Sequence, residues 1–184
     1  MLSRDKIFYN DLTIEIGSER QYLFQLFNPN KDEKRVWMVV KNRGNPVCNC
    51  RVIVEGLEYY FRNEWIIAPN GYDRKALKWD VRNEPIEGMV DITTKGSRPI
   101  EIVRARRIPN PHFRITYYDG STGKTHHFLG KYKLRVKIEA RTTNKGNERN
   151  IESVFYDIFF DYESTLKIGV KEIERVALPN TACT

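Results

Sequence analysis

Alternation of apolar and polar side chains is the feature that most restricts how this chain can fold. It is clearest in KYKLRVKIEAR (131–141), where the two kinds of side chain exchange at almost every step. A strand turns successive side chains to opposite faces of a sheet, so this period predicts strands with one buried and one solvated face. Similar segments run from end to end of the chain: 11–16, 21–27, 35–42, 48–56, 88–94, 98–105, 112–118, 131–141 and 153–162.

Turn-forming residues separate these segments at short intervals, which is typical of an all-β chain. Asn42-Arg43-Gly44-Asn45-Pro46, for example, excludes a helix between two of them. The part from 57 to 88 is less regular and suits long loops or short edge strands. Only the tail, 165–178, has a spacing that a helix could use, although Gly169 disfavours one.

No repeat or composition break divides the 184 residues, and 40% of them are hydrophobic, which is enough for one core. We therefore expect residues 1–184 to form a single domain with a less regular insertion at about 57–88. Strands that give one face to the core and one to water predict an immunoglobulin-like β-sandwich of roughly ten strands in two sheets.

Two groups of segments carry a resemblance. VWMVVKNRGNPVCNCRVIVEG (36–56) resembles a hairpin of the CARDB-like and related immunoglobulin-like domains of prokaryotes. LKW (77–79), PIEI (99–102), FRI (113–115) and GKYKLRV (130–136) are similar to a widespread uncharacterised prokaryotic sandwich domain. The resemblance touches about half the chain and implies a binding module, often attached near a membrane, with no family catalytic residues. The disulfide spacing of antibody domains is absent, because Cys48 and Cys50 lie almost side by side.

The segment GSTGKT (120–125) invites comparison with a phosphate-binding loop. That motif needs a glycine five residues before the Gly-Lys-Thr, where this chain has Tyr118, and a helix after it. The following HHFLGKYKLRVKI alternates like a strand instead. Asp119-Gly120 and Thr122-Gly123 therefore predict a hairpin turn between 115–118 and 125–128.

Metal ligation is not expected from the cysteine and histidine spacing. His126 and His127 are adjacent, so a strand directs them to opposite faces, and His112 could join one of them only through a tertiary contact. Cys48 and Cys50 share a strand face, yet no further paired ligands complete a zinc site, so both are expected to be core residues.

Calcium binding is not expected either. The carboxylates lack the regular spacing of a calcium loop and are interpreted as surface groups: Asp80, Glu84, Glu87, Asp91, Asp157 and Asp161.

Catalysis is also not expected. The chain has no GxSxG elbow and no catalytic-cysteine signature, so we expect no enzyme and no cofactor. A triad assembled from residues distant in the sequence stays an open alternative.

A row of charges lies on the polar face of 131–141. Its positive members, here called the basic strip, are Lys131, Lys133, Arg135, Lys137 and Arg141, with Glu139 among them. At ~3.3 Å per residue the strip extends over roughly 25 to 35 Å. Arg104, Arg106 and Arg107 would extend the same surface if their strand lies nearby. The strip is either the solvated face of a strand, such as an edge strand guarded by lysine, or a docking surface for phosphates.

These observations predict a non-enzymatic interaction module that docks a protein or an anionic, membrane-proximal partner through a sheet face and the basic strip. A formal charge of +7 favours anionic partners. The alternative is a nucleic-acid-binding domain using the same strip, which is disfavoured because no aromatic residue interleaves with its charges. Aromatic residues on both faces of 155–160 indicate either a covering loop or a partner-binding patch.

The sequence predicts a cytoplasmic protein, or one attached to a membrane through a segment outside this chain. Three cysteines are too few and odd in number for a disulfide scaffold. No run approaches the ~18 to 20 apolar residues of a membrane span, and the first ten residues lack a signal-peptide centre. No small-molecule substrate is indicated.

Overall fold

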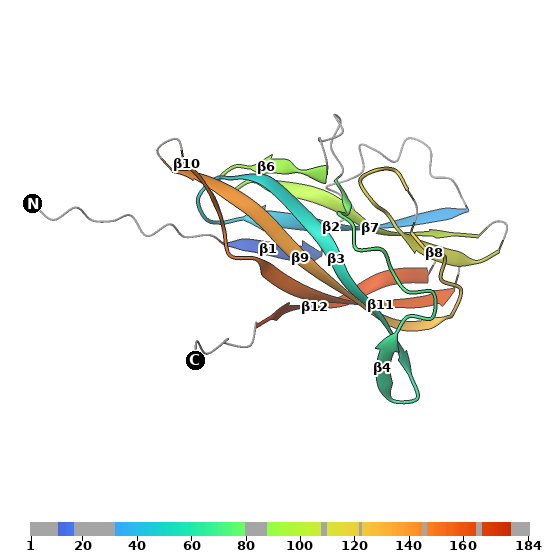
Figure 1. Ribbon diagram of the computed structural model, residues 1–184. Coiled ribbons are helices and arrows are strands. Elements are labelled where there is room, and N and C mark those ends of the chain that lie inside the picture. The colour runs from blue at the N-terminus through green and yellow to red at the C-terminus, as the bar shows by residue number, and fades with distance from the viewer. Residues whose placement is uncertain are drawn as a thin grey trace, which may run out of the picture.

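The computed structural model describes residues 11–16, 32–79, 88–107, 110–121, 123–144, 147–164 and 167–177. Their regular elements are strands in two antiparallel sheets that pack against each other (Figure 1). The predicted all-β sandwich is confirmed, with twelve strands where about ten were expected. The expected strand at 21–27 and the expected surface positions of Asp80, Glu84 and Glu87 fall outside the described residues.

The smaller sheet has five strands. Their order is β1 (Leu12–Ile16), β2 (Glu33–Asn42), β7 (Ser97–Arg106) and β5 (Lys78–Trp79), and β8 (His112–Ile115) also pairs with β7. The sequence predicted most of these strands because their alternation is regular. β7 is the hub of this sheet, since three strands hydrogen-bond to it.

The larger sheet has seven strands. Their order is β12 (Lys167–Val176), β11 (Val154–Ser164), β9 (Gly130–Asn144), β3 (Val47–Phe61) and β4 (Glu64–Ile67). β10 (Asn147–Asn150) pairs with β9, and β6 (Val90–Ile92) pairs with β3. β3 and β9 have 15 residues each and form the centre of the sheet. Figure 1 shows β4 beyond one end of these long strands, and β6 and β10 at the other.

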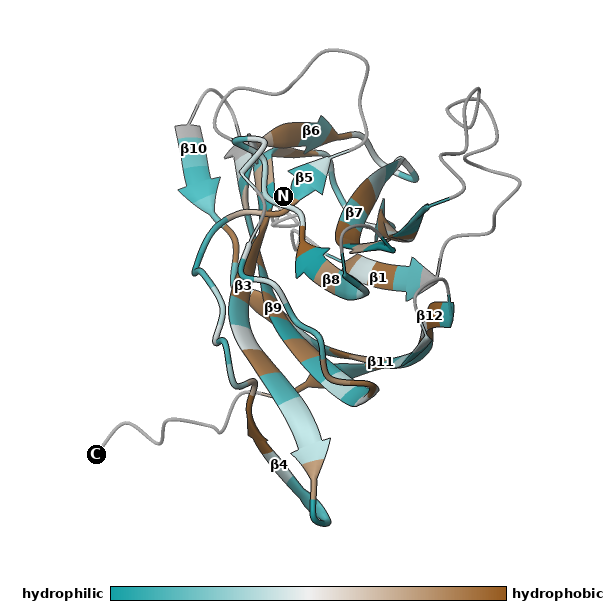
Figure 2. Ribbon diagram, turned by 90° about the vertical axis from the view of Figure 1, so that its right-hand side faces the viewer, coloured by the Kyte–Doolittle hydropathy of each residue, from teal (hydrophilic) through white to brown (hydrophobic). Residues whose placement is uncertain are grey.

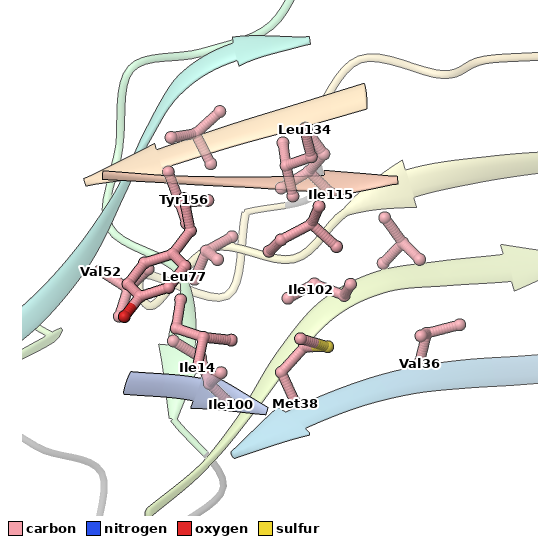
Figure 3. Close-up of a cluster of buried hydrophobic side chains, with 14 of the residues drawn as sticks. Ile14, Val36, Met38, Val52, Leu77, Ile100, Ile102, Ile115, Leu134 and Tyr156 are labelled. Carbon is pink, nitrogen blue, oxygen red and sulfur yellow. The ribbon is translucent and has the colours of Figure 1, made fainter. Parts of the chain in front are cut away.

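The core lies between the sheets and takes side chains from both (Figure 3). Met38, Ile100 and Ile102 enter it from the smaller sheet, and Val52 and Leu134 from the larger. In β9 the alternation is as predicted, because one set of side chains is buried: Tyr132, Leu134, Val136, Ile138 and Ala140.

An aromatic cluster closes one end of this core. Phe113, on β8, meets the edges of three rings from the other sheet, with centroid distances of 4.7 Å to Tyr132, 5.5 Å to Phe160 and 5.3 Å to Tyr162. His126 stacks on the same ring at 4.9 Å. Because Phe113 and the three rings come from different sheets, the cluster ties the two layers together.

The tail forms a strand, and not the helix that its spacing allowed. β12 pairs with β11 in antiparallel register, with an irregularity between Phe159 and Phe160. Ile168 and Val170 lie opposite Tyr162 and Phe160, and Ile173 lies opposite Ile158. The extra residue between Val170 and Ile173 shifts the alternation by one position. That shift is what gave the apolar residues a helix-like spacing.

The two cysteines of β3 do not share an environment. Cys50 is fully buried, as expected, and burial raises the pKa of its thiol to about 12. Cys48 is only half-buried, and its Sγ contacts the carbonyl oxygen of Arg141 at 3.5 Å. Asn49 between them has a φ of 51°, and the register of β3 shifts at this point. This bulge overturns the prediction that both cysteines face the core.

The aromatic cluster gives a direct test of the fold. We expect Phe113→Ala to lower the free energy of unfolding by about 3–5 kcal/mol, because it removes a fully buried ring that touches both sheets. Urea denaturation followed by tryptophan fluorescence measures the change. Phe128→Ala is the matched control, since this ring is 53% exposed and its loss should cost far less. Equal effects of the two substitutions would contradict the placement of Phe113.

Candidate functional site

The basic strip lies on the outer face of the larger sheet, as its alternation predicted, but most of its charges are held in ion pairs. Arg135 makes a two-pronged ion pair with Asp157 on β11, with Nε–Oδ1 and Nη2–Oδ2 distances of 2.7 Å. Asp157 lies directly opposite Arg135 in the register and is buried. The hydrogen bonds and charge of Asp157 raise the pKa of Arg135 above its usual value.

Three further members of the strip, Lys133, Lys137 and Arg141, also meet carboxylates from neighbouring positions. Lys133 pairs with Glu58 on β3, and Lys137 pairs with Glu139 on its own strand. Glu139 also accepts a bond from Arg51, and these cations lower its pKa, Lys137 most strongly. Much of the positive charge of the strip is therefore neutralised within the sheet. Arg141 pairs with Glu148 across the exposed β9–β10 hairpin, at 3.1 Å.

Arg104, Arg106 and Arg107 do not extend the strip, so that expectation is wrong. Arg104 and Arg106 belong to β7, which lies in the other sheet, and Arg107 follows it. Arg104 pairs with the buried Glu101 through Nε–Oε1 and Nη2–Oε2 distances of 2.9 and 3.2 Å. Arg106 pairs with Glu33 on β2 at 2.8 Å. The sequence could not show which strands would pair, and β7 pairs with β2 rather than β9.

The β3–β4 hairpin is the most prominent surface feature. The sequence predicted only long loops or short edge strands for this irregular part of the chain. The turn of the hairpin, Arg62-Asn63, lacks glycine. Both residues nevertheless have positive φ, 50° and 67°, as a tight two-residue hairpin turn requires. Figure 2 shows the hairpin extending beyond the body of the sandwich, with hydrophobic colour on β4 and a hydrophilic turn.

Large apolar side chains are exposed on this hairpin and on the loop beside it. We call this set the apolar hairpin end: Tyr60, Phe61, Ile66, Ile67, Phe128 and Leu129, which are 36% to 72% exposed. Tyr59 links the hairpin to the loop. Its hydroxyl donates to the carbonyl oxygen of Leu129 at 3.0 Å, and its ring lies 6.3 Å from Phe61 and 6.1 Å from Phe128.

Aromatic rings from the hairpin also contact the basic strip. Trp65 lies 5.1 Å from the Tyr60 ring and 5.7 Å from Phe159, and the ammonium of Lys133 sits 5.2 Å from its centre. The Lys131 ammonium lies 5.9 Å from the Tyr60 ring. The expectation that no aromatic residue interleaves with the strip is therefore wrong, because it considered one strand at a time. Phe159, an outward-facing ring of β11, is covered by the hairpin through Trp65.

The segment 116–125 is a turn region and forms no phosphate-binding loop. Gly120 has a φ of 70°, and the Ser121 N–H donates to the Asp119 carboxylate at 2.9 Å. Beyond the turn, Phe113 and His126 exchange backbone hydrogen bonds of 3.0 Å in an isolated bridge. The predicted turn is therefore present, but the predicted strand at 125–128 does not form.

The histidines separate as the sequence indicated. His126 is buried against Phe113, whereas His127 points to the other side of its segment and is exposed. The rings of His127 and His112 are neighbours, with centroids 5.8 Å apart. The tertiary contact that a shared histidine site would need is thus present.

Comparison with protein-family models, with curated proteins and with solved structures found no match. The immunoglobulin-like resemblance therefore stays a prediction beyond the sandwich itself. In the described residues there is no group of three or more histidine, cysteine or acidic side chains placed to hold a metal ion. The same residues contain no helix long and apolar enough to cross a membrane.

The pairing of Arg135 with a buried carboxylate predicts that this strip residue stabilises the fold. We expect Arg135→Ala to lower the free energy of unfolding by about 1–3 kcal/mol, because Asp157 would be left buried without its cation. Arg141→Ala is the matched control, and its exposed pair should contribute less than about 1 kcal/mol. Chemical denaturation of both variants measures the difference. Equal losses would contradict a structural role specific to Arg135.

Burial of His126 predicts a dependence of stability on pH. Burial, followed by the charges of His127 and Lys124, lowers the pKa of His126 from 6.5 to about 4. Between pH 6.5 and pH 4, His126 therefore binds a proton in the unfolded chain but not in the folded chain. As a result, the free energy of unfolding decreases as the pH falls below 6.5. At pH 5 the loss should be about 2 kcal/mol relative to pH 7.5.

Denaturant titrations at pH 5, 6 and 7.5 measure this dependence. The window stays above pH 5 because carboxylates with lowered pKa values, such as Glu33 and Glu139, lose their stabilising effect only at lower pH. His126→Phe, which keeps a ring against Phe113, should remove most of the slope. An unchanged slope in this variant would assign the dependence to other groups.

Proposed function

We propose that this protein is a non-enzymatic interaction module that docks a protein partner with the apolar hairpin end. The observation that carries the proposal is the concentration of large, exposed apolar side chains on one projecting hairpin and its adjoining loop. Solvent-exposed aromatic and aliphatic side chains gathered in one place are typical of interaction sites. Tyrosine, tryptophan and arginine, which the hairpin offers as Tyr60, Trp65 and Arg62, are common anchors of interfaces.

The form of the hairpin favours a protein groove over a bilayer. Its apolar side chains lie on both faces, because Tyr60 shares one face with Trp65 and Tyr59 shares the other with Ile66. A hairpin lying flat on a membrane would bury only one of these faces. A hairpin inserted upright would carry Arg62 and Glu64 into the hydrocarbon first, which is costly. A groove that encloses the hairpin meets both requirements.

The basic strip has a secondary role in this proposal. Most of its members are held in ion pairs, so they add little field beyond the sheet. Lys131 and Arg62 lie beside apolar rings at the hairpin, with Arg62 5.1 Å from the centre of Phe61. Such rim cations raise the association rate and orient an acidic partner, while the apolar contacts supply most of the affinity.

Nucleic-acid binding is the alternative, and one observation favours it. Lys131 and Lys133 alternate with the rings of Tyr60 and Trp65, which is the mixture of cations and aromatic rings that single-strand binders use. The carboxylates on the same face oppose it, because Glu58, Glu139 and Asp157 would repel phosphates. The protein partner therefore remains the favoured proposal.

A site-specific cross-linking experiment tests the proposal. A photoreactive side chain placed at Ile67, the most exposed apolar residue of the set, should label a discrete partner in the cells that make the protein. The same group at Lys95, in the turn between β6 and β7 at the far end of the sandwich, is the position control. The labelled partner is then purified and its affinity measured directly.

The affinities of variants decide the outcome. Phe61→Ser and Ile67→Ser should each weaken the complex by about tenfold or more, since each removes a central apolar contact. Tyr118→Ser, which alters an exposed ring outside the hairpin, should leave the affinity unchanged. Equal weakening by all three variants would overturn the proposal. So would binding of bare single-stranded DNA that falls steeply with salt and is lost in Lys131→Glu, which would establish the alternative.

A further inference from the structure

We propose that His112 and His127 form a binding site for a divalent transition-metal ion such as Zn²⁺, Cu²⁺ or Ni²⁺. Phe113 and His126 face each other in an antiparallel bridge and exchange two backbone hydrogen bonds of 3.0 Å. This register places the next pair outward, His112 and His127, directly opposite each other on the same face. Their ring centroids are 5.8 Å apart with the planes tilted by 60°.

Both rings are held in the orientation that metal-binding histidines adopt. Nδ1 of His112 lies 2.6 Å from the carbonyl oxygen of Asn110, and Nδ1 of His127 lies 2.9 Å from that of Pro111. A carbonyl accepts a hydrogen bond, so each Nδ1 carries the proton and each Nε2 keeps its lone pair. An imidazole anchored in this way to a backbone carbonyl is the usual arrangement around protein-bound zinc.

The spacing of the rings fits one shared ion. An imidazole bound through Nε2 at ~2.1 Å places its centre ~3.2 Å from the metal, and two such rings at a tetrahedral angle lie roughly 5 Å apart. The observed 5.8 Å needs only a small side-chain movement to reach this value. The two Nδ1 atoms contact the carbonyl oxygens of consecutive residues, 110 and 111, so both rings are anchored to the same stretch of backbone and each Nε2 is directed away from its own carbonyl.

The neighbouring groups define what kind of site this is. Arg106 lies opposite His112 in the β7–β8 register, but its guanidinium is engaged by Glu33, which offsets its charge. His126 is on the other face, with Nε2 buried and without a partner, so it is not a ligand of this site. The described residues supply two ligands and no third. The bound ion would keep open positions for water, an anion or a side chain of a partner, as in exchangeable rather than structural sites.

Calorimetric titration with zinc chloride tests the proposal. The parent protein carries Cys48→Ser and Cys183→Ser, because cysteine sulfur is itself a good zinc ligand. We expect one ion per chain and no heat with magnesium, which prefers oxygen ligands. His127→Ala should weaken binding by about tenfold or more, since it removes one of two ligands. This residue is exposed, so the variant should keep its fold, as its circular dichroism and urea midpoint will show.

A second readout identifies the ligand atoms. Side-chain ¹⁵N spectra of the parent should show zinc-dependent shifts at Nε2 of His112 and His127, with His126 unaffected. Binding should also weaken from pH 7.5 to pH 5, because protons compete with the metal for Nε2. Undetectable binding by the parent, or binding of equal strength by His127→Ala, would overturn the proposal. Shifts confined to one histidine would reduce the site to a single ligand and overturn it as well.

Discussion

The antiparallel pairing of β3 with β9 is the interaction on which the rest of the structure depends. The two strands run side by side from Cys48 opposite Arg141 to Tyr59 opposite Tyr132. Their inner side chains form the floor of the core, and their length carries β3 past the smaller sheet into the projecting hairpin. The same pairing brings Glu58 and Arg51 to the lysines and Glu139 of β9. The core, the paired outer face and the exposed end thus follow from one long pair of strands.

The strands and their buried faces were largely predictable, because alternation is a local property. The inward set of β9 and the strand character of β2, β3, β7 and β11 could be read from the sequence. The failures lie at bulges. One extra residue in β12 converts a strand pattern into one with helical spacing, and Asn49 separates the two cysteines. A bulge changes the phase without leaving a clear sign in composition, so periodicity alone misreads it.

The surfaces were less predictable, because each depends on residues distant in the sequence. The basic strip is a row of positive charges only when β9 is considered alone, and its partners Glu58 and Asp157 come from two other strands. The arginines of β7 lie in the other sheet from the basic strip, and the sequence alone does not give the strand order that separates them. The β3–β4 hairpin was not predicted, because its turn has Arg62 and Asn63 in place of the usual Asn-Gly. The alternation of side chains along a strand correctly predicted that His126 and His127 lie on opposite faces. The contact between His127 and His112 depends on the pairing of Phe113 with His126, which the sequence does not show.

The ion pairs in the middle of the larger sheet and the functional candidates therefore lie in different parts of the molecule for a physical reason. In the middle of the larger sheet, outward side chains have neighbours on the adjacent strands. Charged side chains there form cross-strand ion pairs, which stabilise the fold. At the ends of the strands such neighbours run out, and side chains stay exposed. The apolar hairpin end and the exposed His127 lie in this zone, with the buried His112 beside them, and Phe128 follows His127 directly in the sequence. A partner seated on Phe128 and Leu129 would approach the open positions of an ion held by His112 and His127. A histidine or carboxylate contributed by that partner could complete the coordination, so metal binding and docking would then strengthen each other.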